Sequence, residues 1–247
     1  MTRTDLATAL STLTRLPTAW LWPTNPVINA PRAIWAYPIA GALIGAIAAA
    51  CFAVLHKAGC STAIAAFWTL AAMLLTTGAL HEDGLADTAD GFGGGRTRER
   101  KLEIMRDSRI GSYGACALVL SLALRGIAIA ELDGNVAALI AACALSRASA
   151  GLLLALLPPA RPEGLSAAVA APPRIAVVVS LAIGIGFTLA FLPITKALAA
   201  ITLALLTAAA MARLSRRHIG GHTGDVLGAT IVIAECAILT ECSLRFG

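Results

Sequence analysis

The feature that most constrains the fold of this chain is a series of long apolar segments. A segment of roughly 17 to 25 apolar residues can cross a hydrocarbon core about 30 Å thick. The 247-residue sequence contains seven such segments: 33–55, 62–80, 112–130, 136–157, 175–192, 195–212 and 226–243. Inside a bilayer, a segment's backbone polar groups find partners only within its own helix. We therefore predict an all-α, polytopic integral membrane helix bundle with about seven transmembrane helices, forming a single domain over residues 1–247.

The composition supports this prediction, and the basic residues add an orientation. With 58% apolar and 13% charged residues, the chain has too little polar surface for a soluble globule. Seven spans place fourteen of the nineteen basic residues on the side of the N-terminus: Arg3, Arg15, Arg32, Arg96, Arg98, Arg100, Lys101, Arg106, Arg109, Arg161, Arg174, Arg213, Arg216 and Arg217. The opposite side holds only Lys57, Lys196 and Arg245. Lys and Arg favour cytoplasmic loops, so we predict a cytoplasmic N-terminus.

The first 32 residues are predicted to form an interfacial segment. The stretch "TDLATALSTLTRLP" is amphipathic, ends in Pro17 and lacks the continuous apolar core of a signal peptide. A short helix at the cytoplasmic interface fits it, with Trp20, Trp22 and Trp35 at headgroup depth. A disordered tail is the alternative. The six cysteines form no Cys-x-x-Cys pair and are expected to be reduced packing residues.

Carboxylates gather at the end of the second apolar segment, in "HEDGLADTADG" from His81 to Gly91. Asp83, Asp87 and Asp90 stand at i, i+4 and i+7, which places them within an arc of about 60° on a helix. Lipid would exclude such a face, and in water its charges would repel one another. A shared divalent cation would stabilise them, and oxygen-only ligands favour Mg²⁺ or Mn²⁺ over zinc.

The residues that follow are suited to binding phosphate, and we treat 81–111 as a cytoplasmic active-site loop. Its glycines, Gly91, Gly93, Gly94 and Gly95, are expected to expose backbone N–H donors to an anion. Its arginines offer planar forks for phosphate oxygens: Arg96, Arg98, Arg106 and Arg109. This combination predicts a phosphate or pyrophosphate substrate. The alternative is that these arginines only set the topology, and the charges from Glu99 to Glu103 are typical of a solvated helix face.

A second cytoplasmic active-site loop is predicted at 213–225, in "RRHIGGHTGDVLG". His218 and His222 have the i, i+4 spacing of a zinc pair, but the two glycines between them argue against a regular helix. A glycine turn that presents Thr223 and Asp225 at the start of the last span fits better, because a helix N-terminus favours anions. We predict a second half-site for phosphate or metal there.

Ionisable residues inside spans are functional candidates by default. Arg147 could point inward toward an anionic group of a ligand, and Glu235 is its most obvious counter-ion. A purely structural Arg–Glu pair that fixes helix register fits equally well. Arg125 lies near the far end of its span and is expected to snorkel to the interface.

Four motifs together resemble one enzyme family. They are "TRLP" at 14–17, "YPIAG" at 37–41, "GALHEDGLADTADGFGGGRTRERKLEIMRDSRIGSYG" at 78–114 and "GGHTGDVLGA" at 220–229. In this order they resemble the cobalamin-5′-phosphate synthases, also called adenosylcobinamide-GDP ribazoletransferases, and the long central motif is the most specific. The departures are His222, where an aromatic residue such as tyrosine is expected, and Glu82, a loosely specified position.

The resemblance implies a Mg²⁺-dependent reaction at a bacterial inner membrane, with the active site facing the cytoplasm. Adenosylcobinamide phosphate would pass from adenosylcobinamide-GDP to α-ribazole or its 5′-phosphate, releasing GMP. The small-molecule substrates and the bilayer are the expected partners, with no nucleic acid; a homodimer is left open. The assigned roles are metal binding by Asp83, Asp87, Asp90 and Asp225, phosphate binding by Arg96, Arg106, Arg109, Arg147 and Thr223, and catalysis by His81 and Asp87.

Other membrane proteins share parts of this pattern. A CDP-alcohol phosphotransferase usually shows Asp-Gly-x-x-Ala-Arg, but here Asp87 replaces that arginine. An aspartate-rich prenyltransferase has two separated acidic motifs, whereas the second site here has only Asp225. A transporter would place its ionisable residues near mid-membrane, whereas most of the charge here lies at one face.

Overall fold

The computed structural model describes residues 1–132 and 134–244. The elements in this part of the chain are α1 (Arg3–Leu13), η1 (Ala19–Leu21), α2 (Ala30–Ala33), η2 (Ile34–Ala36), α3 (Tyr37–Lys57), α4 (Thr62–Thr77), α5 (Leu80–Gly94), α6 (Arg98–Ile104), α7 (Ser112–Ala130), α8 (Ala138–Leu156), α9 (Leu165–Ala168), α10 (Arg174–Phe191), α11 (Ile194–Ile219) and α12 (Gly224–Ser243). No β-strand occurs among these residues; one isolated bridge joins Pro159 and His222. The all-α prediction is confirmed.

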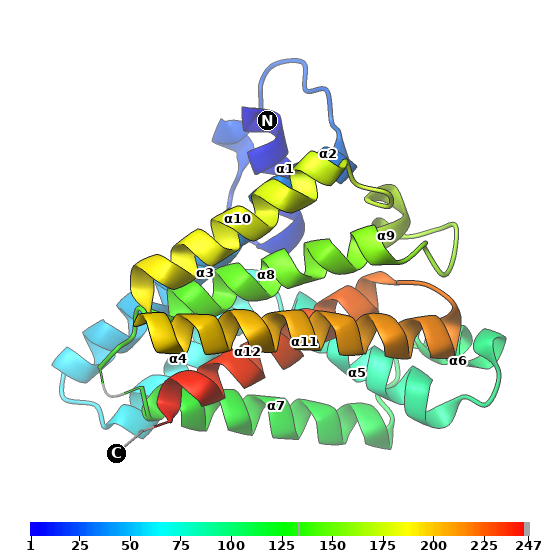
Figure 1. Cartoon of the computed structure of the whole chain (residues 1–247). Coiled ribbons are helices and arrows are strands. Elements are labelled where there is room, and N and C mark those ends of the chain that lie inside the picture. Colours follow the sequence, from blue (N-terminus) through cyan, green and yellow to red (C-terminus); the bar gives the residue numbers. More distant parts are fainter. Residues whose placement is uncertain (133, 245–247) are drawn as a thin grey trace.

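The predicted spans correspond to long apolar helices (Figure 1). Six elements in the described residues are long and apolar enough to cross a membrane: Ala30–Lys57, α7, α8, α10, α11 and α12. The second predicted span differs, because α4 and α5 are bent by 89° at a short break. The described residues therefore contain six continuous candidate spans, and a seventh only if this broken pair counts as one. A polytopic membrane fold is confirmed.

Helices α8 and α12 form the centre of the bundle. In their most apolar windows, 78% of α8 and 67% of α12 is buried, compared with 28% for both α10 and α11. Glycines let α3 pack closely on α8: a Cβ at Gly41 would lie 2.2 Å from the carbonyl oxygen of Cys143, and one at Gly45 would lie 2.5 Å from that of Leu139. Small residues of this kind drive helix association in membranes. The six cysteines are free thiols, as expected.

The helix ends separate into two groups. The connections α5–α7, α8–α10 and α11–α12 lie together at one end of the bundle, at the right of Figure 1, and the connections α3–α4, α7–α8 and α10–α11 lie at the other. The connections therefore alternate between the two ends in the same order as was assumed when the basic residues on each side of the membrane were counted. Arg245, which was assigned to the sparsely charged side, lies outside the described residues.

The N-terminal segment folds as a helix against the bundle, so the disordered-tail alternative is wrong. Helix α1 begins with a capping box between Thr2 and Asp5. Asp5 is also clamped by Arg32 at 2.9 Å and by the indole N–H of Trp35 at 3.2 Å. Burial raises the pKa of Asp5, but these hydrogen bonds outweigh burial and hold the pKa below its usual value. Trp20, by contrast, is 70% exposed.

Candidate active site

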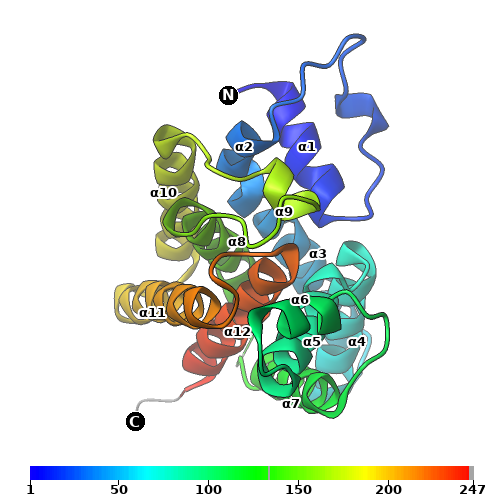
Figure 2. The same cartoon turned by 90° about the vertical axis from the view of Figure 1, so that its right-hand side faces the viewer.

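Helix α5 carries the acidic motif and starts at a sharp break. Gly78 ends α4 with φ of 65°, and Ala79 follows with φ of 55°. A left-handed alanine is strained, and such strain is found at functional sites. Gly78 is required for a second reason, since a Cβ there would lie 2.5 Å from Nε of Arg15. The break turns α5 away from α4 and carries α5 toward the end of the bundle where α6 lies (Figure 1), and Figure 2 looks onto that end, where α6 packs against α5.

Two glycines allow α5 and α12 to cross closely. A Cβ at Gly84 would lie 2.7 Å from the backbone oxygen of Asp225, and one at Gly228 would lie 3.1 Å from the backbone oxygen of His81. The first turns of the two helices therefore meet. Asp83 of α5 and Asp225 of α12 are brought together although they are far apart in the sequence.

The predicted aspartates have different environments. Asp83 is exposed, Asp87 is half-buried, and Asp87 interacts electrostatically with Asp83, Asp225 and Asp90. Asp90 is buried, and its two oxygens accept backbone hydrogen bonds from Gly111 at 2.7 Å and Gly114 at 2.9 Å. Asp90 thus caps the first turn of α7, where a carboxylate is favoured. Its carboxylate is already committed to the fold, unlike that of Asp87.

A pocket of about 180 Å³ opens beside the crossing of α5 and α12. Its charged and polar lining includes His81, Asp83, Arg161 and Asp225, and its apolar wall includes Leu13, Tyr37, Val169, Leu227 and Ile231. An apolar wall with a few convergent polar groups is typical of a small-molecule site. The pocket therefore brings residues of both predicted active-site loops together with residues of the N-terminal segment.

Arg161 is a site residue that the sequence reasoning missed, because it was counted only as a topology signal. It lies in the loop after α8, and its Nη2 approaches Oδ2 of Asp225 at 3.3 Å. Its Nη1 is buried and has no hydrogen-bond partner within the described residues. Since a guanidinium offers five donors in a planar fork, Arg161 can still bind an anion in the pocket. We call Asp83, Asp87, Asp225 and Arg161 the pocket cluster. Asp87 does not line the pocket, but it interacts electrostatically with the other three residues.

His81 lies buried at the wall of the pocket. The side chain is 3% exposed and lines the pocket, and its Nε2 is buried without a hydrogen-bond partner in the described part of the chain. Buried polar atoms are nearly always paired, so an unpaired nitrogen in a pocket points to a ligand partner. This placement is consistent with the role assigned to His81 from the sequence.

The predicted phosphate-binding arginines of the first loop lie on the surface, and one of them is next to the pocket. Arg106 pairs with Glu163 at 2.9 Å, and these two residues line a hollow that they share with Arg161. Arg109 bonds to Asp107 at 2.6 Å, and its hydrogen bonds lower the pKa of Asp107 to about 2. Arg96 is exposed. The structure thus brings Arg106 next to the site and leaves Arg96 and Arg109 as surface cations.

The expectation that the glycine-rich stretch exposes N–H donors is wrong. Gly91, Gly93 and Gly94 lie within α5, and Gly95 donates back to the carbonyl of Gly91. Their backbone donors are used by the helix itself. The absence of side chains instead serves packing, because a Cβ at Gly91 would lie 2.4 Å from the Met105 side chain.

The second predicted loop is shorter than expected, because α11 continues to Ile219, but the expected glycine turn follows that helix. Gly220 ends α11 with φ of 74°, and the hydroxyl of Thr223 caps α12 by accepting from the backbone N–H of Val226 at 3.3 Å. Thr223 is buried, so it supports the site through the helix terminus. His218 stacks on Phe92 with ring centroids 4.5 Å apart.

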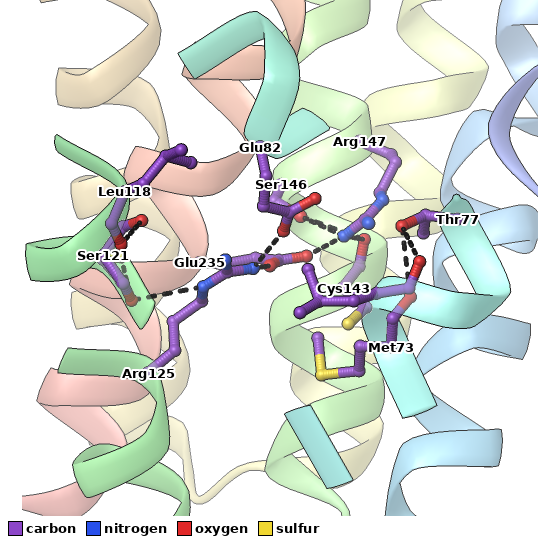
Figure 3. A network of polar contacts seen from close by, with 12 residues as sticks. Met73, Thr77, Glu82, Leu118, Ser121, Arg125, Cys143, Ser146, Arg147 and Glu235 are labelled. Atoms are coloured by element: carbon purple, nitrogen blue, oxygen red, sulfur yellow. Dashed lines mark hydrogen bonds and ion pairs between the residues drawn. The ribbon is translucent and has the colours of Figure 1, made fainter. Parts of the chain in front are cut away.

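The charged residues inside the spans form one connected network (Figure 3). Arg125 contacts Glu82 at 2.8 Å and Glu235 at 3.0 Å, and Arg147 pairs with the other oxygen of Glu235. The expectation that Arg125 snorkels is wrong, because it is 1% exposed and held by these two carboxylates. Arg147 is equally buried, and its pairing favours the structural alternative over phosphate binding. We call Glu82, Arg125, Arg147 and Glu235 the buried network.

Comparison with known proteins identifies the family of this chain. The family model described as cobalamin-5-phosphate synthase matches residues 5–243. An adenosylcobinamide-GDP ribazoletransferase of Bradyrhizobium diazoefficiens is 48% identical over 95% of this chain and 91% of its own length. Proteins of the same name from Azorhizobium caulinodans and Mesorhizobium japonicum are 53% and 45% identical, over 84% and 97% of this chain and 82% and 93% of their own lengths. No solved structure matches. The chain belongs to the cobalamin-5-phosphate synthase family.

Proposed function

We propose that this chain transfers adenosylcobinamide phosphate from adenosylcobinamide-GDP to a ribose hydroxyl of α-ribazole or its 5′-phosphate. The products are adenosylcobalamin, or its 5′-phosphate, and GMP, which makes the reaction a late step of cobalamin synthesis. The observation that carries the proposal is the pocket where His81, Asp83, Asp225 and Arg161 converge from three separate parts of the sequence. Family membership, together with the relatives' names, identifies the substrates.

Charge is the main requirement of this reaction. The ribose oxygen bonds to the cobinamide phosphorus while the phosphoanhydride bond breaks, and negative charge grows on the leaving GMP. Stabilisation of that charge and alignment of the hydroxyl supply most of the rate in phosphoryl transfer. Arg161, with Arg106 beside it, neutralises the diphosphate. His81 Nε2 accepts the proton of the attacking hydroxyl, with Asp87 as the alternative acceptor.

The pocket cluster also fits a bound Mg²⁺. Three carboxylates and one guanidinium leave an excess of negative charge around Asp87. Within the described residues no three Asp, Glu, His or Cys side chains are close enough to enclose an ion on their own. Mg²⁺ usually takes one or two carboxylates and completes its shell with water and substrate phosphate. We place the ion between Asp83, Asp87 and Asp225, with one or two of these carboxylates as direct ligands, where it would neutralise the diphosphate; Asp90 is left to cap α7.

The proposed location is the inner membrane of a bacterium, with this pocket open to the cytoplasm. Fourteen basic residues belong to the segments on that side, and nucleotide substrates are cytoplasmic. A cysteine at position 96, in a background without the native cysteines, should react with a membrane-impermeant maleimide only in inverted vesicles. Labelling in right-side-out vesicles would contradict the orientation.

The activity itself is tested with purified protein in liposomes. Adenosylcobinamide-GDP, α-ribazole and Mg²⁺ should together yield GMP and a cobalamin, and omission of α-ribazole should prevent release of GMP. Folded protein that releases no GMP under these conditions would contradict the proposed function. GMP release without α-ribazole would indicate a hydrolase.

A further inference from the structure

The buried network joins the acidic helix to the centre of the bundle. Its four charged groups come from four helices: Glu82 from α5, Arg125 from α7, Arg147 from α8 and Glu235 from α12. Arg125 lies between the two carboxylates, and Figure 3 shows the four side chains meeting in one layer between the helices. Two arginines and two glutamates balance in charge, so the network can persist inside a membrane span.

Stability alone does not account for the network. Within the described residues, Oε2 of Glu82, Nη2 of Arg125 and Nε of Arg147 are buried without hydrogen-bond partners. A buried ion pair with unpaired polar atoms recovers its desolvation cost poorly, and apolar residues of similar size are often as stable or more stable. A network of this kind is better explained by the geometry that it fixes.

The geometry at stake is that of α5. The break at Gly78 and Ala79 separates α5 from α4, so no continuous helix sets its rotation or its position along its axis. Those must come from lateral contacts, which α5 makes mainly with α12 and α7 and also with α6. Glu82 supplies the charged part of these contacts, and it lies directly between His81 and Asp83 in the sequence. A shift of α5 by one residue would move His81 and Asp83 by about 1.5 Å.

We infer that Glu82, through its ion pair with Arg125, is a positioning residue that holds α5 in the rotation and register at which His81 and Asp83 face the substrate. This inference rests on the proposed function, because it concerns the same pocket. Neither Glu82 nor Arg125 lines the pocket. Their effect on the reaction is indirect, and a displacement of about 1 Å can lower a rate about 100-fold.

The test compares two double variants that each remove one Arg and one Glu from the network. Glu82→Leu with Arg125→Met removes the ion pair that joins α5 to α7 and leaves the neutral pair Arg147–Glu235. Arg147→Met with Glu235→Leu leaves the neutral pair Glu82–Arg125. Both should keep a wild-type melting temperature in detergent. The first should lower kcat at least tenfold with little change in KM, and the second should lower kcat by a clearly smaller factor.

Controls separate positioning from general damage. Arg100→Gln with Glu103→Gln removes an exposed ion pair on α6 and should leave kcat and KM unchanged. Arg125→Lys, which keeps a cation paired with Glu82, should have a kcat well above that of the variant Glu82→Leu with Arg125→Met. Equal kcat losses in the two double variants, or wild-type kcat in the first, would overturn the inference. Wild-type protein assayed alongside reports on the proposed function itself, so an inactive wild type is distinguishable from a failed positioning role.

Discussion

Helices α5 and α12 each supply acidic residues to two groups of charged side chains, and the two groups differ in net charge. The pocket cluster takes Asp83 and Asp87 from α5 and Asp225 from α12, with Arg161 as the single cation. The buried network takes Glu82 from α5 and Glu235 from α12, matched by two arginines. A charge-balanced group inside the protein can be structural, whereas a group with excess negative charge at a pocket is stabilised when a cation from outside binds to it. The difference in net charge therefore distinguishes the buried network, which is structural, from the pocket cluster, which we propose takes part in the reaction. Both lie on the same two helices.

The largest expected effect comes from the pocket cluster. Asp87→Asn keeps the size of the side chain but removes the charge at the centre of the carboxylates, so turnover should fall at least about 1,000-fold, which corresponds to about 4 kcal/mol of barrier. Expression and melting temperature should stay near wild type. GMP release measures turnover, and thermal unfolding in detergent measures the melting temperature. Retained turnover would show that the site lies elsewhere.

The next largest effect comes from unbalancing the buried network. Arg125→Met alone leaves two carboxylates facing only Arg147, and breaking one side of a buried ion group costs about 3 to 5 kcal/mol. The melting temperature should fall sharply, and adding Glu82→Leu should restore it because charge balance returns. If the single and double variants unfold at the same temperature, charge balance does not stabilise this region.

A smaller effect is expected at Arg161. Arg161→Gln removes a charged donor that is partly exposed, so a loss of about tenfold in apparent affinity, or about 1.4 kcal/mol, is expected for adenosylcobinamide-GDP. The KM for α-ribazole should change less, since α-ribazole itself carries no diphosphate. Arg100→Gln, which removes an exposed arginine of α6, is the matched control and should leave both KM values unchanged. Equal changes in the two KM values for Arg161→Gln would contradict its assignment to the diphosphate.

The last expected effect, on stability and not on activity, is a pH dependence at the start of α12. Burial lowers the pKa of His222 from 6.5 to about 4, so the unfolded chain binds this proton more tightly than the folded one. Stability is independent of His222 above about pH 6.5 and falls as the pH drops toward 4, by at most about 1.4 kcal/mol per pH unit. His222→Phe should lose less stability than wild type between pH 7 and pH 5. Parallel losses would show that other groups cause the acid sensitivity.

The sequence predicted what local patterns encode. Apolar length identified the membrane helices, the spacing of Asp83 and Asp87 identified one helical face, and the glycine turn before Thr223 identified the start of the last helix. These signals depend on neighbours within a few residues, so a single sequence is enough to reveal them. The resemblance of the central motif then added the substrates, which no pattern of spacing contains.

The sequence could not predict the long-range partners. Arg125 and Glu235 are 110 positions apart, and nothing local marks their pairing. Asp90 was predicted on the same helical face as the other two aspartates, but the N-terminus of α7 takes its carboxylate. Arg161 is one of many loop arginines, and only the folded chain places it at Asp225. In each case the role depends on a contact made after folding, which helical periodicity does not record.

The central claim is that excess negative charge in the pocket cluster recruits a divalent cation together with the diphosphate. Electron paramagnetic resonance of Mn²⁺, with GDP as the diphosphate, tests it without requiring turnover. Wild type and the variant Glu82→Leu with Arg125→Met should each bind one Mn²⁺ per chain in the presence of GDP, and Asp87→Asn should bind none. Equal Mn²⁺ binding by Asp87→Asn, or none by the wild type, would contradict the account.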